Sequence, residues 1–288
     1  MSIKTLALAS AAFLVAQSAA FAQFSQVYAI DVRPTPNRLL TWAVNATSTA
    51  QVNIQSANAS FDGFGVDFNT AGTILYGINP GAAPFSFGTI DLLTGNFNTM
   101  FALSGLGAGQ SVTGLRVDPT NETFYVSSNG ATFGNQLQTL NTTTGALSSA
   151  VNLTGLAAGA IVIDIAISNT GQMFGIDIGS DTLVSIDKVT GASTTIGLLG
   201  FNANFAQGMD FDLATNTLYA TIYTGGGTGV FASINLTTGA ATQLFSTTAL
   251  NAEMEMAIRP VPEPTTGMLL VSGLGLAAAA LRYRRNRR

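Results

Sequence analysis

The sequence predicts an all-β protein, a five-bladed β-propeller closed by a C-terminal strand. Two observations carry this prediction: a strand-and-turn pattern recurs along the chain, and no long stretch with the period of an amphipathic helix occurs between the two chain ends. The recurring Thr-Gly turns are spaced 50, 46 and 48 residues apart. A unit of roughly this length with four short strands is typical of a propeller blade. The turn glycines are Gly95, Gly145, Gly191 and Gly239.

Each of these turns reads Asp/Asn-x-x-Thr-Gly between strands that alternate apolar and small polar residues. This is hairpin chemistry, because an Asp or Asn side chain caps the turn and the glycine adopts the positive φ that other residues avoid. The strands are rich in Ile, Val, Phe, Tyr and Thr, which favour the extended conformation. We therefore expect the first turn residue, such as Asp91 or Asp187, to have a structural role.

The two ends of the repeat array predict how the ring closes. Residues 26–31, 39–44 and 50–54 look like the last three strands of a blade whose first strand is missing. Residues 255–260 (EMAIRP) resemble the first strands of the other repeats and complete that blade, which hides the sheet edges. About 47 residues per blade gives five blades over residues 24–260; a six-bladed ring with a degenerate blade is the alternative.

Composition excludes several classes of function. The 288 residues include no Cys and no His, so a Ser-His-Asp triad, a Cys nucleophile, a Cys/His zinc site and disulfides are all impossible. Catalysis would have to rest on carboxylates, Tyr, Lys or an oxygen-bound metal. Only 9% of the residues are charged, with a net charge of −4, and this argues against nucleic acid as a partner.

Residues 1–22 read as a secretory signal peptide. Lys4 provides the positive charge, residues 6–16 the apolar segment, and Ala20-Phe21-Ala22 a small-residue cleavage site for signal peptidase. The mature chain is then expected to begin at Gln23 with the propeller, residues 23–260.

Residues 261–288 form a second signal with three parts. A Pro-Glu-Pro motif (Pro262, Glu263 and Pro264) precedes an uncharged apolar segment, 265–281, which predicts a single transmembrane helix. An arginine-rich tail, 282–288, follows, and the positive-inside rule keeps it in the cytoplasm with the body across the inner membrane, in the periplasm. Membrane retention is assigned to five residues of this tail: Arg282, Arg284, Arg285, Arg287 and Arg288.

This arrangement resembles the PEP-CTERM sorting signal of exported bacterial proteins. The resemblance implies processing by an exosortase, a membrane enzyme that would cut near 262–264 and end the transient anchoring. The body would then reach the cell surface or extracellular matrix, often together with exopolysaccharide. A plain tail anchor is the alternative. The repeats more loosely resemble exported propellers of the WD40/quinoprotein-like type.

Aligning the first strand of each repeat predicts a charged cluster on the propeller axis. Side chains two residues apart on a strand face the same way, so five charged residues converge there. They are Asp67, Arg116, Asp164, Asp210 and Glu255. One interpretation is a site for Ca²⁺ or a small ligand, the only cofactor the sequence suggests. The other is a solvated channel wall in which the carboxylates cap loops and Arg116 pairs with a neighbour.

Three functions follow from these features. The first is a non-enzymatic, structural or interaction module of the cell surface or matrix, linked to exopolysaccharide or biofilm. The second is a glycoside hydrolase that uses the axial carboxylates as acid and base, and the third is a lectin-like carbohydrate binder. Residues 23–264 contain 15 acidic and five basic residues, a net charge of −10, which disfavours acidic polysaccharides unless a divalent cation bridges.

Overall fold

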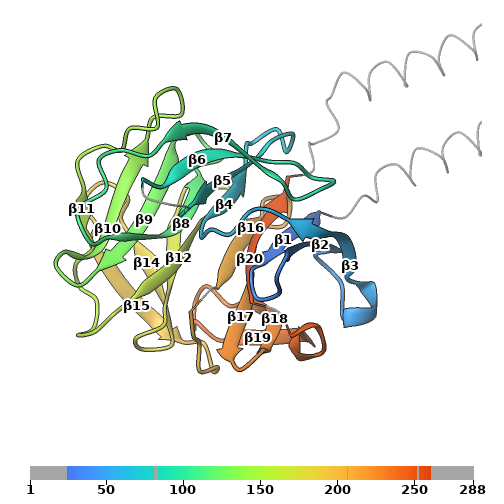
Figure 1. Ribbon diagram of the computed structural model, residues 1–288. Coiled ribbons are helices and arrows are strands. Elements are labelled where there is room, and N and C mark those ends of the chain that lie inside the picture. Colours follow the sequence, from blue (N-terminus) through green and yellow to red (C-terminus); the bar gives the residue numbers. More distant parts are fainter. Residues whose placement is uncertain (1–24, 81–83, 206, 252, 261–288) are drawn as a thin grey trace, which may run out of the picture. The chain divides into compact units, whose positions relative to one another are not determined.

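The computed structural model describes residues 25–80, 84–205, 207–251 and 253–260, and these form five four-stranded antiparallel sheets arranged as the blades of a propeller (Figure 1). Each blade runs from an inner strand at the axis to an outer strand at the rim. In that order, blade 1 consists of β4 (Val66–Phe68), β5 (Leu75–Asn79), β6 (Ser86–Ile90) and β7 (Phe97–Ala102). Blade 2 consists of β8 (Ser111–Val117), β9 (Phe124–Gly130), β10 (Gly134–Leu140) and β11 (Val151–Asn152). Blade 3 consists of β12 (Val162–Ile167), β13 (Met173–Asp177), β14 (Thr182–Ile186) and β15 (Ser193–Leu198).

The last two blades complete the ring. Their strands are β16 (Gly208–Asp212), β17 (Thr217–Gly225), β18 (Thr228–Ile234) and β19 (Ala241–Ser246) in blade 4, and β20 (Met254–Arg259), β1 (Gln26–Asp31), β2 (Asn37–Ala43) and β3 (Asn53–Ala59) in blade 5.

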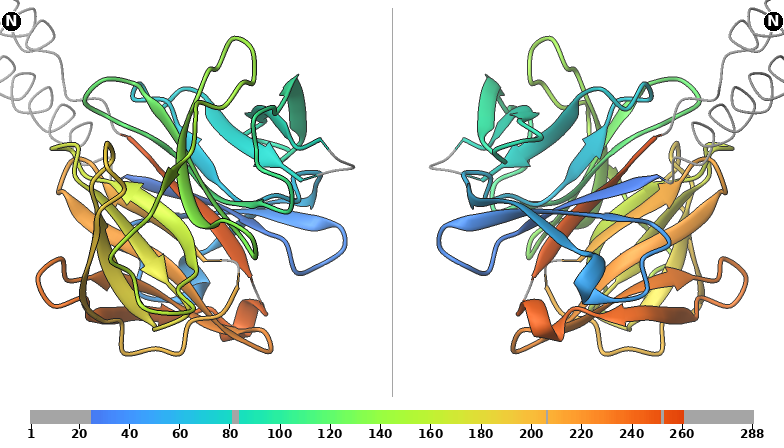
Figure 2. Two further views of the ribbon diagram at one scale, coloured as in Figure 1. Left: turned by 90° about the vertical axis from the view of Figure 1, so that its left-hand side faces the viewer. Right: turned by 90° about the vertical axis from the view of Figure 1, so that its right-hand side faces the viewer.

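Blade 5 joins the two ends of the described chain. The C-terminal strand β20 lies beside the N-terminal strand β1 (Figure 2) and pairs antiparallel with it, with Val27 opposite Ile258. This confirms the predicted closure and the number of five blades. The strand predicted at 50–54 was placed too early, because residues Thr49–Gln51 form a short 3₁₀ turn, η1, capped by Ser48, and β3 begins only at Asn53. A second 3₁₀ turn, η2 (Thr248–Leu250), precedes β20.

Burial decreases from the axis to the rim. Every residue of β12 is buried, whereas β7 exposes most of its side chains. An inner strand is covered on both faces by the neighbouring blades and is therefore buried along almost its whole length, while most residues of the outer strands are exposed or half-buried. The core therefore consists of layers between adjacent blades rather than one central mass.

Aromatic residues fill these layers. Trp42 of blade 5 packs edge-on against Phe231 of blade 4, with ring centroids 5.3 Å apart. Tyr76 of blade 1 meets Phe124 of blade 2 at 5.1 Å. Tyr76 and Phe124 belong to the apolar–aromatic pairs Leu75-Tyr76 and Phe124-Tyr125, which occupy the same position in two repeats, and here they are packing residues.

The Asp/Asn-x-x-Thr-Gly turns also fasten neighbouring blades together. In the turn of blade 1, the Asp91 carboxylate accepts hydrogen bonds from the Thr94 amide (2.8 Å) and hydroxyl (2.9 Å), and Gly95 has a φ of +71°. The Gly95 carbonyl then accepts a hydrogen bond from Ser60 N (3.2 Å), just beyond the outer strand of blade 5. Equivalent bonds to the preceding blade are made by the carbonyls of Gly145 and Gly191.

The predicted signal peptide (1–22) and sorting signal (261–288), including the apolar segment 265–281, lie outside the described residues. Within the described part of the chain, no helix has the length and apolar character needed to cross a membrane.

A close approach of two inner strands generates the first prediction. A Cβ added at Gly208 in β16 would lie 2.3 Å from the Met256 amide nitrogen in β20. We expect Gly208→Ala to lower the free energy of unfolding by about 1–3 kcal/mol, because the backbones cannot both keep their places. Urea denaturation measures the change. As a control, Gly107→Ala would meet only the side chain of Phe133 and of Gln110, no nearer than 3.3 Å, and should cost much less. Equal losses in the two variants would contradict this account.

Candidate functional site on the propeller axis

The inner strands bring the five predicted charged residues together at the centre of the ring. Asp67 lies on β4, Arg116 on β8, Asp164 on β12, Asp210 on β16 and Glu255 on β20, so each blade contributes one residue. All five are at most 7% exposed. We call this group the axial cluster. Its burial differs from the solvated channel wall that the sequence suggested, because the inner strands approach one another closely enough to exclude solvent.

Arg116 lies at the hub of the axial cluster. Its guanidinium forms an ion pair with Asp164, with 2.8 Å between Nη2 and Oδ2. The guanidinium nitrogens, Nη2 included, also donate to backbone carbonyl oxygens on the inner strands of all four other blades. These acceptors are Ile165 on β12 (2.5 Å), Met256 on β20 (3.2 Å), Val66 on β4 and Met209 on β16. One side chain therefore contacts every other blade of the ring.

Each carboxylate of the axial cluster reaches from its own blade to the backbone of the next. Asp67 accepts from Val117 N (2.7 Å), which links blade 1 to blade 2. The other carboxylates link blade 3 to 4, 4 to 5 and 5 to 1, through Asp164 with Met209 N (2.8 Å), Asp210 with Ile258 N (2.6 Å) and Glu255 with Gly65 N (3.2 Å). The hydrogen bond from Arg116 to Ile165 O links blade 2 to blade 3. Every junction of the ring is thus held by one of the five residues.

A glycine on an inner strand, Gly114, and one just before an inner strand, Gly65, make room for these contacts. A Cβ added at Gly114 would lie 2.5 Å from Asp164 Oδ1, in the space that the carboxylate fills. Gly65 has a φ of +96° and points its amide at Glu255. The pairing of β12 with β13 shifts its register just before Asp164, at a β-bulge, which turns that side chain toward the axis. Small residues and a bulge therefore position the charges.

Burial raises the pKa of all four axial carboxyl groups. For Asp164 burial outweighs the attraction of Arg116 and two amide hydrogen bonds, and its pKa is raised to about 7. The pKa of Asp67 is raised by burial and by Asp210, and that of Glu255 by burial and by Asp164. Burial alone lowers the pKa of Arg116, but the surrounding carboxylates more than reverse this, so Arg116 stays charged.

The axial cluster does not have the geometry of a calcium site. Asp67 and Asp210 each use both oxygens to accept backbone hydrogen bonds, one within the strand and one to the next blade. The place where a cation would sit is taken by the guanidinium. Among the described residues no three acidic side chains are grouped so that they could hold a metal ion. Glu255 Oε1 is buried without a hydrogen-bond partner in this part of the chain, and a single free oxygen is not a metal site.

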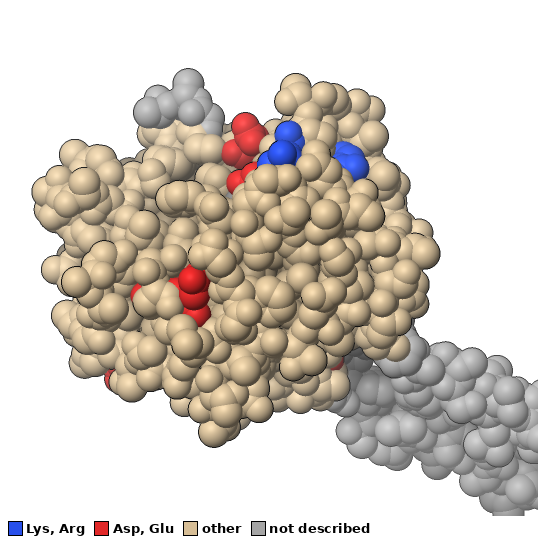
Figure 3. All heavy atoms as spheres, turned by 90° about the horizontal axis from the view of Figure 1, so that it is seen from below, with Lys and Arg blue, Asp and Glu red and all other residues tan. Residues whose placement is uncertain are grey.

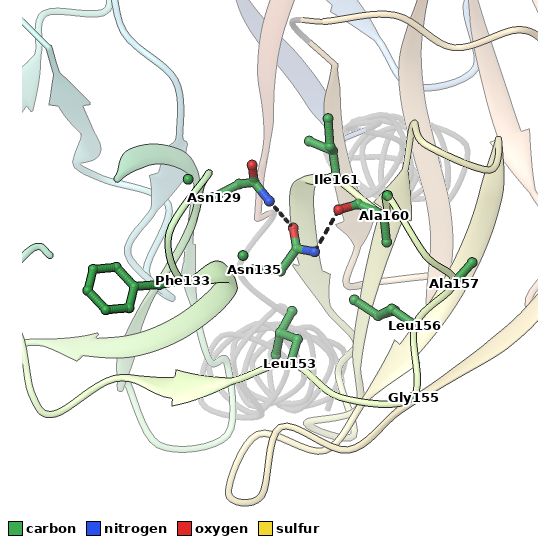
Figure 4. A pocket seen from close by; sticks show the side chains of 12 residues that line it. Asn129, Phe133, Asn135, Leu153, Gly155, Leu156, Ala157, Ala160 and Ile161 are labelled. Carbon is green, nitrogen blue, oxygen red and sulfur yellow. Dashed lines mark hydrogen bonds between the residues drawn. The ribbon is translucent and has the colours of Figure 1, made fainter. Parts of the chain in front are cut away.

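Sequence reasoning missed a cleft between blades 2 and 3. It lies between the β9–β10 hairpin and the segment 153–161, has a volume of about 490 Å³, and is lined in part by Asn129, Phe133 and Asn135 (Figure 4). The hairpin loop is not shared by the other repeats, so the repeat pattern carried no signal for it. The available signal was an aromatic residue within the Gly- and Asn-rich stretch NGATFGNQ.

Comparisons with known proteins identify the C-terminal signal. Residues 260–285 match the family model of the PEP-CTERM protein-sorting motif. This confirms the resemblance seen in the sequence, and the motif marks the chain as an exported protein sorted by an exosortase. A search of curated proteins found no match.

Solved structures with a similar fold include a protein of unknown function from Bacteroides caccae, which is 13% identical and has a TM-score of 0.42, with 77% of this chain and 72% of that chain covered. A chain of a nidogen/laminin complex is 11% identical with a TM-score of 0.49, covering 82% and 98% respectively. TolB from Acinetobacter baumannii is 11% identical with a TM-score of 0.48, covering 82% and 67%.

The hub position of Arg116 predicts a large effect of its removal. Arg116→Met leaves buried carboxylates and carbonyl groups without their donor, and we expect it to cost about 3–5 kcal/mol of unfolding free energy or to prevent folding. Urea denaturation of the purified variant provides the measurement. Arg33→Met is the matched control, because Arg33 is exposed and its side chain makes one hydrogen bond, to the Tyr223 hydroxyl (2.7 Å), so its removal should cost only about 1 kcal/mol. An Arg116→Met protein as stable as the wild type would contradict the role of the axial cluster.

The raised pKa values predict that stability falls as pH rises. In the unfolded chain these carboxyl groups titrate near their ordinary values, 3.8 for Asp and 4.5 for Glu, so above those values the folded state holds more protons than the unfolded state. The stability that these carboxyl groups contribute is fully present below their pKa values in the unfolded chain. It is lost as pH rises through their pKa values in the folded protein, about 7 for Asp164. Urea midpoints should therefore decrease between pH 5 and pH 8.

Glu255→Gln tests the origin of this pH dependence. The amide oxygen can still accept the hydrogen bond from Gly65 N, but the variant has one fewer buried acid, so its stability should depend less steeply on pH. The turn acids Asp91 and Asp187 have pKa values lowered by amide hydrogen bonds and titrate below this window. A wild-type profile that is flat or rises from pH 5 to pH 8 would refute the prediction.

Proposed function

We propose that the exported chain is a non-enzymatic module of the cell surface or extracellular matrix, which holds exopolysaccharide without cleaving it. The observation that carries this proposal is that the charged groups of the axial cluster are occupied by contacts within the protein. The carboxylates that a propeller hydrolase would need are buried, and their oxygens accept hydrogen bonds from the protein's own backbone. A group bound in this way stabilises the ring and is not free to transfer protons to a substrate.

The outer surface supports the same function. On the face seen in Figure 3, charged side chains are few and most of the surface is uncharged. The outer strands β3, β7, β11, β15 and β19 contain no charged residue and are rich in Thr, Asn, Ser and Gln. Hydroxyl and amide groups of this kind bind hydroxylated polymers through hydrogen bonds that require no cation bridge.

The sorting route indicates where the protein would act. Signal peptidase would cleave after Ala22, and the apolar segment 265–281 would hold the body on the periplasmic side of the inner membrane. Exosortase would then cut near 262–264 and deliver the propeller to the surface or matrix. Its expected partners are these two processing enzymes and the exopolysaccharide, without a cofactor and without nucleic acid.

Glycoside hydrolysis is the competing function. It needs one carboxylic acid and one carboxylate facing the same bond, with access for a sugar. Asp67 and Asp210 are the candidates with the largest exposed fraction, and both are buried.

The test uses the processed protein recovered from the cell exterior and the polysaccharide from the same cells. We expect the protein to sediment with the polysaccharide and to release no reducing ends, which a colorimetric assay measures. Asp210→Asn, which keeps one of the two oxygen acceptors, is the control variant. Thermal unfolding checks that it is folded, and the folded variant should bind equally. Reducing ends that appear with the wild type and disappear with Asp210→Asn would replace this proposal with a hydrolase. Failure to sediment would overturn the link to polysaccharide.

A further inference from the structure

The cleft between blades 2 and 3 combines features that the axial cluster lacks: it is open, uncharged and lined by side chains with free surface. Phe133, at the tip of the β9–β10 hairpin, lies at one rim and is 48% exposed. Leu156 and Ala157 lie across from it, and an asparagine pair occupies the middle (Figure 4). Its volume of about 490 Å³ is within the range of small-ligand sites, roughly 300–1,000 Å³.

The asparagine pair is held in one orientation. Asn129 Nδ2 donates to Asn135 Oδ1 (2.8 Å), and Asn135 Nδ2 donates to the Ala160 carbonyl (2.9 Å). Asn135 Oδ1 also accepts from Val162 N (2.8 Å), so this residue joins the two blades. Asn129 Oδ1 accepts no hydrogen bond from any described residue, although it is fixed by its own amide group. A preoriented acceptor therefore faces the cleft region without a partner.

Two glycines keep the walls open. Gly134 and Gly159 line the cleft with φ angles of +65° and +78°, and a Cβ added to either would meet no atom within 4 Å. A ligand can therefore approach the main chain closely at both positions. The junction of blades 3 and 4 is built differently, because there the turn residue Asp181 accepts a hydrogen bond from Ala203 N (2.7 Å), which fastens the interblade loop to the turn.

The chemistry of the lining indicates the ligand class. No lining residue carries a charge, so the cleft offers no counterion to an acidic or basic ligand. It offers an exposed aromatic ring, a free amide oxygen, apolar side chains and accessible main chain. A ligand that matches this set has many hydroxyl donors, no charge, and apolar C–H faces that can stack on a ring.

We propose that this cleft binds a neutral saccharide chain, with a sugar ring stacked on Phe133 and a hydroxyl group donating to Asn129 Oδ1. The inference rests on the proposed function and assigns it a site and a ligand class. An apolar peptide segment is the competing occupant.

Isothermal titration calorimetry of the processed protein tests the proposal. The probes are neutral tetrasaccharides of β-linked glucose, α-linked glucose and β-linked xylose, an acidic oligogalacturonate, and a short leucine-rich peptide. We expect at least one neutral probe to bind and the other two classes not to. Phe133→Ala and Gly159→Asn, the latter tolerated at a positive φ and projecting into the cleft, should each weaken binding about tenfold or more.

Two matched controls lie in another interblade loop. Phe205 is 56% exposed, and Gly200 has a φ of +80° with no atom within 4 Å of an added Cβ, so Phe205→Ala and Gly200→Asn make the same chemical changes outside the cleft. Both should bind as the wild type does, and thermal unfolding should show that all four variants are folded.

The outcomes separate the two proposals. Neutral saccharide that binds the wild type and both cleft variants equally would overturn the cleft as its site and leave the surface function standing. Binding of the peptide or of oligogalacturonate alone would overturn the ligand class. If no probe binds while the protein still sediments with its own polysaccharide, the cleft proposal fails and the proposed function survives.

Discussion

The ring depends on the hydrogen bonds of one guanidinium group. A propeller brings the inner strands of its blades to a common axis, where their carbonyl oxygens converge and repel one another. Arg116 has five N–H donors in a planar array and remains charged under all conditions. Its contacts with carbonyl groups of four other blades turn that repulsion into attraction. Because a buried cation must be paired, the axial carboxylates follow from its presence.

Those carboxylates do a second task that Arg116 does not perform. Arg116 satisfies carbonyl oxygens, whereas Asp67, Asp164, Asp210 and Glu255 satisfy amide groups of the neighbouring inner strand. Toward the rim, the carbonyls of Gly95, Gly145 and Gly191 make the same kind of link at three of the five junctions. At these three junctions the blades are fastened both at the axis and toward the rim, with apolar layers between. This leaves the loops between blades as the part of the fold that can vary without loss of the ring.

The sequence predicted the number of blades and the closure of the ring better than it predicted the roles of individual residues. The spacing of Gly95, Gly145, Gly191 and Gly239 gave the blade length, and the strand at 255–260 gave the closure, because both depend on local patterns. Strand periodicity also placed the axial charges together. It could not show that they are buried, since this depends on how closely strands from different repeats approach. The repeat pattern could not predict the cleft beside Phe133, because the loops that form it do not repeat.

The burial of the axial cluster also changes what the net charge means. The acidic and basic residues of 23–264 sum to −10, which suggested that the body repels acidic polymers. Four of these acids and one of the bases are in the axial cluster, so up to three of those negative charges never face solvent. Asp31 and Asp118 are also buried, in ion pairs with Arg38 and Lys188. The surface that a partner would meet is therefore less acidic than the sequence implies.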